Sequence, residues 1–142
     1  MSQADVEAVV DQFDAVNERD FQRGMDGYTD DVVLYASPDS GPKAGKYEGK
    51  EEVGEWFGDW FRSFEPGYRF QIQEAQELRP GMVFLTATHH GRGRVSGVDV
   101  RGENAYLYLV RDGKVAQVGF FASRDEALEA AELPEWSEAQ TD

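Results

Sequence analysis

Four stretches in the second half of the chain have residue patterns typical of β-strands, and these patterns constrain the fold more than any other feature. In the first of them Tyr68, Phe70 and Ile72 alternate with polar side chains. Successive residues of a strand point to opposite faces of a sheet, so such alternation is typical of half-buried strands. The stretches NAYLYLV and KVAQVGFF flank RDGK, which is a strong hairpin signal. Residues 68 to 121 therefore predict a meander of antiparallel strands.

The first half of the chain has helical periodicity instead. Apolar residues recur every three or four positions from Val6 to Val16, after a Ser2 and Asp5 pair typical of a capping box. The same reasoning predicts the remaining elements, which are a short helix from Phe21 to Met25 capped by Asp20, a strand over 28–37, a loop over 37–49, an aromatic-rich helix over 50–64 and a helix over 123–133 capped by Ser123.

This order of elements indicates an α+β fold, because a parallel doubly wound sheet needs strands and helices in alternation. We expect a strongly curved antiparallel β-sheet with helices packed on its concave face, because such a sheet would bury the apolar stripes of the helices. A length of 142 residues suits one hydrophobic core. We therefore place a single domain at residues 1–133, followed by a loose acidic tail over 134–142.

Acidic residues dominate the charge, since 28 Asp and Glu stand against 14 Lys and Arg, for a formal net charge of −14. Nucleic acid and anionic membranes are disfavoured as partners, because binding phosphates requires a clustered basic face. The start MSQADVEAVV lacks the regions of a signal peptide, and the chain has no cysteine, so we expect a cytoplasmic location. A surface rich in carboxylates is typical of proteins kept soluble in high salt, which suggests a halophilic source.

Several stretches carry a family resemblance, namely YTDDVVLY, YEGKEEVGEWF, GRGRVSGVDV, and YLYLVRDGKV running on to SRDEALEAAEL. In these stretches the chain resembles the SnoaL-like branch of the nuclear transport factor 2-like superfamily, from about Val6 to Leu133. The resemblance implies the cone-shaped fold and a homodimer formed through the open face of the sheet. It does not single out one activity, since that family includes isomerases, dehydratases, cyclases, hydrolases and non-catalytic binders.

The chain has two histidines, His89 and His90, which are adjacent on a predicted strand. Adjacent strand residues point to opposite faces, so the pair cannot jointly bind one metal ion, and we predict no metal site. His89 shares the parity of the apolar positions on this strand and is expected to point into the concave interior and contact a ligand, whereas His90 is not. Gly91 and Gly93 on the same face leave space that holds either a ligand or large aromatic side chains. A buried neutral imidazole with no further role is the alternative for His89.

Two tyrosines of the predicted hairpin, Tyr106 and Tyr108, share one face. The resemblance places Tyr106 where steroid-isomerase-like members carry a protonated acid that stabilises an oxyanion, and a phenol can do the same. The candidate catalytic residues are therefore His89 and Tyr106. The complete predicted ligand pocket consists of Leu34, Trp56, Trp60, Ala87, His89, Tyr106, Tyr108 and Phe120.

The place of Phe120 depends on the hairpin loop. A three-residue loop with a glycine bulge puts Val118 and Phe120 on the tyrosine face, whereas a two-residue loop puts Gln117 and Gly119 there. The sequence leaves both registers open.

The chain also departs from the steroid-isomerase pattern. The resemblance places Ala36 at the position of the catalytic aspartate of those proteins and Gln12 at that of an essential tyrosine, which disfavours ketosteroid isomerisation. Asp30 and Asp31 are expected to be solvated residues at a strand end, and Asp99 a residue of the rim.

Three functions remain open on this evidence. The first is a module that binds a hydrophobic metabolite in the cone cavity, which the absence of an inward carboxylate near His89 favours. The second is a cofactor-free acid-base enzyme of cyclase, dehydratase or isomerase type, with His89 as base and a tyrosine as oxyanion donor. The third is a scaffold with a collapsed cavity. We expect no cofactor, and a small hydrophobic molecule as the partner.

Overall fold

One curved sheet organises the residues that this computed structural model describes, 3–38 and 43–136. Along the chain the elements are α1 (Gln3–Asn17), α2 (Phe21–Asp26), β1 (Tyr28–Ala36), β2 (Gly45–Glu48), α3 (Gly49–Arg62), β3 (Arg69–Arg79), β4 (Met82–Arg92), β5 (Asp99–Arg111), β6 (Lys114–Phe121), α4 (Arg124–Ala130) and a 3-10 turn (Pro134–Trp136). The strands lie in the order β2-β1-β6-β5-β4-β3. Neighbouring strands are antiparallel except β1 and β6, which run parallel.

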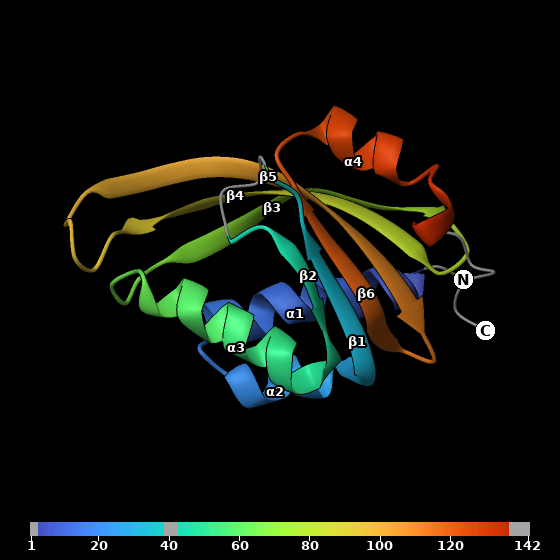
Figure 1. Cartoon of the computed structure of the whole chain (residues 1–142), viewed down its shortest axis with the longest axis horizontal. Coiled ribbons are helices and arrows are strands. Elements are labelled where there is room, and N and C mark those ends of the chain that lie inside the picture. Colours follow the sequence, from blue (N-terminus) through green and yellow to red (C-terminus); the bar gives the residue numbers. More distant parts are fainter. Residues whose placement is uncertain (1–2, 39–42, 137–142) are drawn as a thin grey trace.

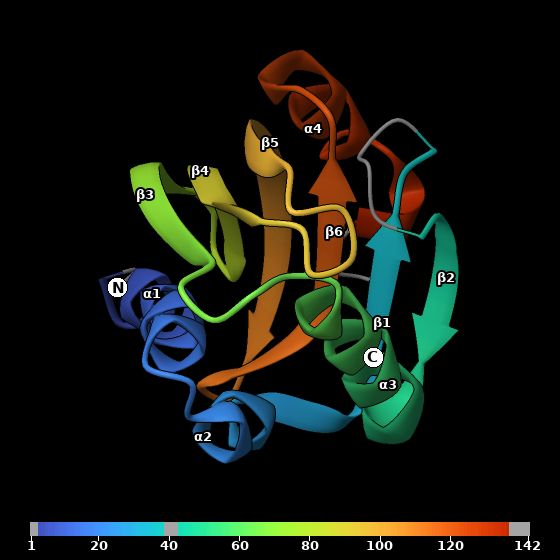
Figure 2. The same ribbon diagram turned by 90° about the vertical axis from the view of Figure 1, so that its left-hand side faces the viewer.

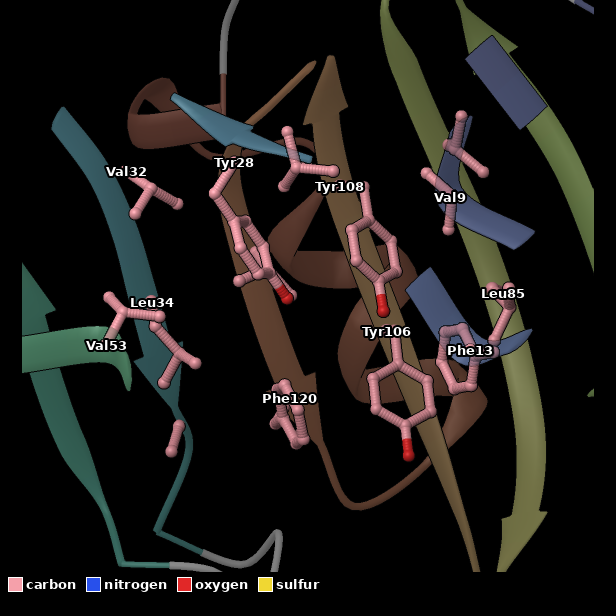
Figure 3. Packing of buried hydrophobic residues seen from close by; sticks show 14 of the residues in the cluster. Val9, Phe13, Tyr28, Val32, Leu34, Val53, Leu85, Tyr106, Tyr108 and Phe120 are labelled. Atoms are coloured by element: carbon pink, nitrogen blue, oxygen red, sulfur yellow. The ribbon is translucent and has the colours of Figure 1, made fainter. Parts of the chain in front are cut away.

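Helices α1, α2 and α3 lie on the concave side of the sheet, below it in Figure 1, and Figure 2 shows α2 between α1 and α3. Val9 and Phe13 of α1 and Val53 and Trp56 of α3 are buried in one cluster with inward side chains of β1, β4, β5 and β6 (Figure 3). Burial of these apolar stripes against the sheet is what holds the helices in place. The expected α+β fold, a cone-shaped curved sheet with helices on its concave face, is confirmed.

Two helix caps agree with the sequence signals, whereas Ser2 of the expected capping box lies outside the described residues. The Asp20 side chain accepts a hydrogen bond from the Arg23 backbone N–H at 3.2 Å, and the Ser123 hydroxyl accepts one from Glu126 at 3.1 Å. The loop predicted over 37–49 is wrong in part, because Gly45–Glu48 form β2 along the edge of β1. Residues 39–42 of that loop lie outside the described residues. Pairing with a distant strand decides β2, and the local run of Pro, Gly and Lys carries no signal of it.

Helix α4 lies on the opposite face of the sheet from the other three (Figure 1). It covers an apolar cluster with the members Met82, Phe84, Ala105, Leu107, Leu109, Phe121, Ala127, Ala130, Ala131 and Trp136. The segment 134–142 is therefore not loose throughout, since Trp136 is buried with its ring centroid 6.3 Å from that of Phe121. Residues 137–142 lie outside the described residues. Because α4 covers part of this face, less of it is left for the predicted homodimer.

The β5–β6 hairpin resolves the register of Phe120. Asp112 and Gly113 form a two-residue loop with φ angles of 53° and 79°, as a type I′ turn requires. The register then shifts, because Val110 pairs with Val115 and Leu109 with Gln117, which leaves one extra residue in β6. As a result Phe120 lies opposite Tyr106, on the tyrosine face. The loop therefore has two residues, but Phe120 lies on the tyrosine face, which was expected only for a three-residue loop.

Candidate functional site

The main cavity of the described residues lies between α1, α2, α3 and the connection from α3 to β3, and its volume is about 570 Å³. Its lining consists of Gln12, Val16, Arg19, Phe21, Gly24, Met25, Tyr28, Gly54, Phe57, Gly58, Phe61, Arg62, Phe64, Glu65, Pro66, Tyr68 and Arg94. Most of these side chains are apolar, and the charged ones are all in or near the segments where α1, α3 and β4 end. Helices and loops thus supply most of the walls.

Two glycines on α3 leave the space open. Gly54 and Gly58 are one turn apart on α3 and both line the cavity, and Gly54 faces Met25 of α2. A Cβ atom added at Gly54 would lie 3.5 Å from its nearest neighbour, the Cε of Met25, which is an ordinary contact distance. The surroundings therefore have room for a side chain at this position. Glycine inside a helix costs about 1 kcal/mol relative to alanine. Glycine nevertheless occupies two helical positions that line the same cavity.

Aromatic rings form the apolar part of the lining. Phe57 and Phe61 stack with ring centroids 6.1 Å apart and planes at 10°, and Phe21 of α2 stacks on Phe61 at 5.5 Å. At the far end Phe64 lies flat on Tyr68 with centroids 4.1 Å apart. Such surfaces suit a flat apolar ligand, which gains both from burial and from contact with ring faces.

One buried polar side chain, Gln12 of α1, also lines the cavity. Its amide lies against Gly27, where an added Cβ would be 1.8 Å from Nε2, so only glycine fits there. The sequence analysis noted Gln12 only for its departure from the family pattern. The missed signal was its position, since it lies three residues after Val9 and next to Phe13, on the apolar stripe of the helix.

His89 is inside the fold and His90 is outside it, as the strand alternation predicts. The imidazole of His89 is buried, whereas His90 is exposed, with Nε2 3.0 Å from Oδ1 of Asp99. His89 does not line the cavity, however, because Tyr68 lies between them and its hydroxyl is 3.0 Å from Nδ1 of His89. The space expected beside Gly91 is filled by Tyr68, since a Cβ added at Gly91 would lie 2.5 Å from Tyr68 Cδ1.

The hydrogen bonds of His89 define its protonation. The Trp60 indole N–H donates to the Tyr68 hydroxyl at 3.1 Å, which leaves the Tyr68 proton to donate to Nδ1. Burial lowers the pKa of the His89 imidazole below its ordinary value of 6.5, and a hydrogen bond with the Asn104 side chain opposes this shift. His89 is therefore neutral at neutral pH, with its proton on Nε2. This matches the alternative of a satisfied buried histidine.

The structure separates the predicted pocket residues into three groups. Tyr106, Tyr108 and Phe120 line a recess of about 30 Å³ that shares five lining residues with the main cavity. That volume is far below the roughly 300 to 1,000 Å³ of ligand pockets, so the recess by itself does not hold a metabolite. Burial raises the pKa of both tyrosines, which keeps their hydroxyls protonated.

The other predicted residues lie outside both spaces. Leu34, Trp56 and Ala87 are packed in the core, and Trp60 and His89 belong to the hydrogen-bonded chain behind Tyr68. None of the predicted residues lines the main cavity. The alternation along the strands correctly predicted which side chains point inward. Where helices pack against these side chains, however, they fill the interior and leave no cavity.

The carboxylates near the strand ends are solvated, as expected. Asp31 pairs with Arg111 at 2.9 Å and Asp30 with Lys50 at 3.8 Å, and both carboxylates are exposed. Ala36 is buried beside Phe120, so no base stands at that position. Within residues 3–38 and 43–136, no group of three or more His, Asp or Glu side chains is placed to hold a metal ion. Over the same ranges no helix is long and apolar enough to cross a membrane.

A curved sheet that closes on three helices around an apolar cavity defines the class of cone-shaped folds of the nuclear transport factor 2-like kind. Residues 9–118 match the SnoaL-like domain family, which is most of the chain, and the chain belongs to that family. No curated protein sequence matches it.

Solved structures agree on the fold. TerC, crystallised with polyporic acid, is 19% identical with a TM-score of 0.71 over 92% of this chain and 99% of its own. Rv0760c from Mycobacterium tuberculosis, in complex with estradiol-17beta-hemisuccinate, is 18% identical with a TM-score of 0.71 over 88% and 97%. An NTF2-like protein of unknown function from Burkholderia pseudomallei is 14% identical with a TM-score of 0.73 over 92% and 98%. At these identities the likeness concerns the fold alone.

Proposed function

We propose that this protein binds a small apolar molecule in the cavity between α1, α2 and α3. The observation that carries the proposal is the cavity itself, about 570 Å³ with a mainly aromatic lining and one buried amide, Gln12. Ligand pockets of proteins typically measure roughly 300 to 1,000 Å³ and combine apolar walls with a few polar groups. Two proteins of the same fold, TerC and Rv0760c, are complexed with small molecules.

Binding is favoured over the acid-base alternative by the surroundings of the candidate groups. A base must reach the proton that it removes to within about 3 Å or through one water. His89 lies behind Tyr68 and already uses Nδ1 for the Tyr68 hydroxyl. Tyr106 borders only the small recess. Of the hydrogen-bonded residues Trp60, Tyr68 and His89, only Tyr68 lines the cavity. A catalytic role for His89 would therefore have to act through the Tyr68 hydroxyl.

The test is a substitution on α3 that fills the cavity with a larger side chain. Gly58→Leu places an isobutyl group in the cavity from α3, where the nearest atoms to an added Cβ belong to the flexible Arg62 side chain. Binding is measured with phenylnaphthylamine, an uncharged probe that fluoresces in apolar sites. We expect Gly58→Leu to weaken its binding at least about tenfold, because the new side chain removes the space that the probe occupies.

The matched control adds the same side chain on the outer face of the same helix. Glu55 of α3 is exposed and does not line the cavity, so Glu55→Leu should leave the probe affinity within about twofold. Thermal unfolding of both variants checks that the fold is kept. Equal affinity of Gly58→Leu and the original chain for the probe would overturn the proposal.

A further inference from the structure

Three arginines stand at the mouth of the cavity. They are Arg19 just after α1, Arg62 at the end of α3 and Arg94 just after β4. One carboxylate, Glu65, lines the same mouth. The chain as a whole has 28 acidic and 14 basic residues, so the excess of positive charge at this cavity is opposite in sign to the net charge of the protein. An incoming anion would meet repulsion from most of this protein and attraction at this point.

Backbone carbonyls hold two of these guanidinium groups in place. Arg19 donates to the carbonyls of Val16 at 3.0 Å and Tyr68 at 2.7 Å. Arg94 donates to the carbonyls of Arg62 and Phe64, both at 3.0 Å. Each guanidinium has five N–H donors, so more than half of them remain for a ligand. The contacts fix orientation at the mouth without neutralising the charge.

Arg19 and Arg94 do not form salt bridges within the described residues. Among the same residues Arg62 pairs only with Asp59, at 2.5 Å. Guanidinium groups bind carboxylates through two parallel hydrogen bonds, and such charge-assisted bonds are the strong ones. Next to low-dielectric aromatic walls their attraction for an anion increases.

Taking the proposed function as its basis, we infer that the ligand is an amphipathic organic acid. Its aromatic or polycyclic body lies against Phe57 and Phe61, and its anionic group, a carboxylate or an ionised enol, lies at the mouth between Arg19 and Arg94. The aromatic lining supplies affinity for the body, and the arginines select ligands by charge.

Two probes with the same ring system separate charge from burial. Anilinonaphthalene sulfonate carries one sulfonate, and phenylnaphthylamine is its uncharged parent. Both are titrated at one fixed ionic strength against the original chain, Arg19→Gln and Arg94→Gln. We expect each substitution to weaken the sulfonate probe about three- to tenfold, the range for a partly exposed charge-assisted contact, and to change the uncharged probe less than about twofold.

Arg92→Gln is the matched control, because the Arg92 side chain is exposed near the end of β4, donates to the Gly97 carbonyl and does not line the cavity. It changes the net charge by the same amount and should leave both probes within about twofold. Glu65→Gln works in the opposite direction, since it removes the one carboxylate of the mouth and should tighten the sulfonate probe about twofold.

Arg94 also bonds carbonyls at the end of α3, so each variant is checked by thermal unfolding. If either Arg19→Gln or Arg94→Gln does not fold, the other of these two variants decides the test. Equal losses for both probes, or no loss for the sulfonate probe, would overturn the inference while leaving the cavity as a binding site. A failure of Gly58→Leu to reduce binding of either probe would overturn the proposed function and this inference together.

Discussion

Two regions of the concave interior use aromatic side chains in opposite ways. Around β5 and β6 the rings fill the space, with Tyr106 edge-on to Phe13 at 5.3 Å and to Phe120 at 4.8 Å (Figure 3). Between α2 and α3 the rings line a cavity, because Gly54 and Gly58, which lie beside Phe57 and Phe61 on α3, put no side chain into it. The comparison teaches that aromatic content does not locate a pocket. The small residues beside the rings do.

The largest effect is expected in the filled region. Phe120→Ala removes a buried ring that contacts Tyr106, Trp56 and Phe57, and such substitutions cost about 3 to 5 kcal/mol of unfolding free energy. Chemical denaturation measures the loss. Phe61→Ala in the open region is the counterpart, and because Phe61 is half-buried beside the cavity its cost should be about half as large. Equal costs would remove the distinction between the regions.

The next effect concerns the boundary between the two regions, where His89 lies. His89→Ala removes the partner of the Tyr68 hydroxyl and should cost about 1 to 3 kcal/mol at pH 8. His90→Ala, at the exposed neighbour that faces Asp99, is the control and should stay within about 0.5 kcal/mol. A loss for His90→Ala as large as that for His89→Ala would contradict the assignment of the two faces.

The cost of His89→Ala should also depend on pH. The pKa of His89 is lowered by burial in the folded protein, so the unfolded chain binds more protons as the pH falls below 6.5. The stability contributed by the neutral imidazole is present above 6.5 and is lost as the pH falls through the folded pKa. Denaturation curves at pH 8, 6.5 and 5.5 should therefore show the difference between the two proteins shrinking. A difference that widens toward low pH would contradict the sign.

The smallest effect is expected in the open region. Gly54→Ala adds one methyl group at ordinary contact distance, 3.5 Å from Met25 Cε, and should raise the unfolding free energy by about 0.5 to 1 kcal/mol. Thermal unfolding detects such a gain. Gly102→Ala is the contrast, because its Cβ would lie 2.9 Å from His89 Nε2 and the variant should be less stable. If Gly54→Ala destabilised the protein as much, the space beside α3 would be filled rather than open.

Much of the fold could be predicted because its signals are local. Asp20 and Ser123 cap the expected helices, and strand alternation correctly separated His89 from His90. The hairpin register could not be predicted, because the extra residue of β6 lies beyond the turn that the sequence reveals. The same holds for β2, whose pairing partner is distant in the chain.

The candidate site depended on tertiary structure to a greater degree. The sequence alone determined the α+β class, the inward residues of the sheet and the net negative charge, since each follows from periodicity or composition, and the family resemblance implied the cone shape. Only the tertiary structure decided that inward residues such as Tyr106 are packed over, that Tyr68 shields His89, and that the cavity opens between α2 and α3. The physical reason is that the size of a cavity depends on the distance between the elements around it and on which side chains face each other across that distance. The order of residues along one strand or helix determines neither.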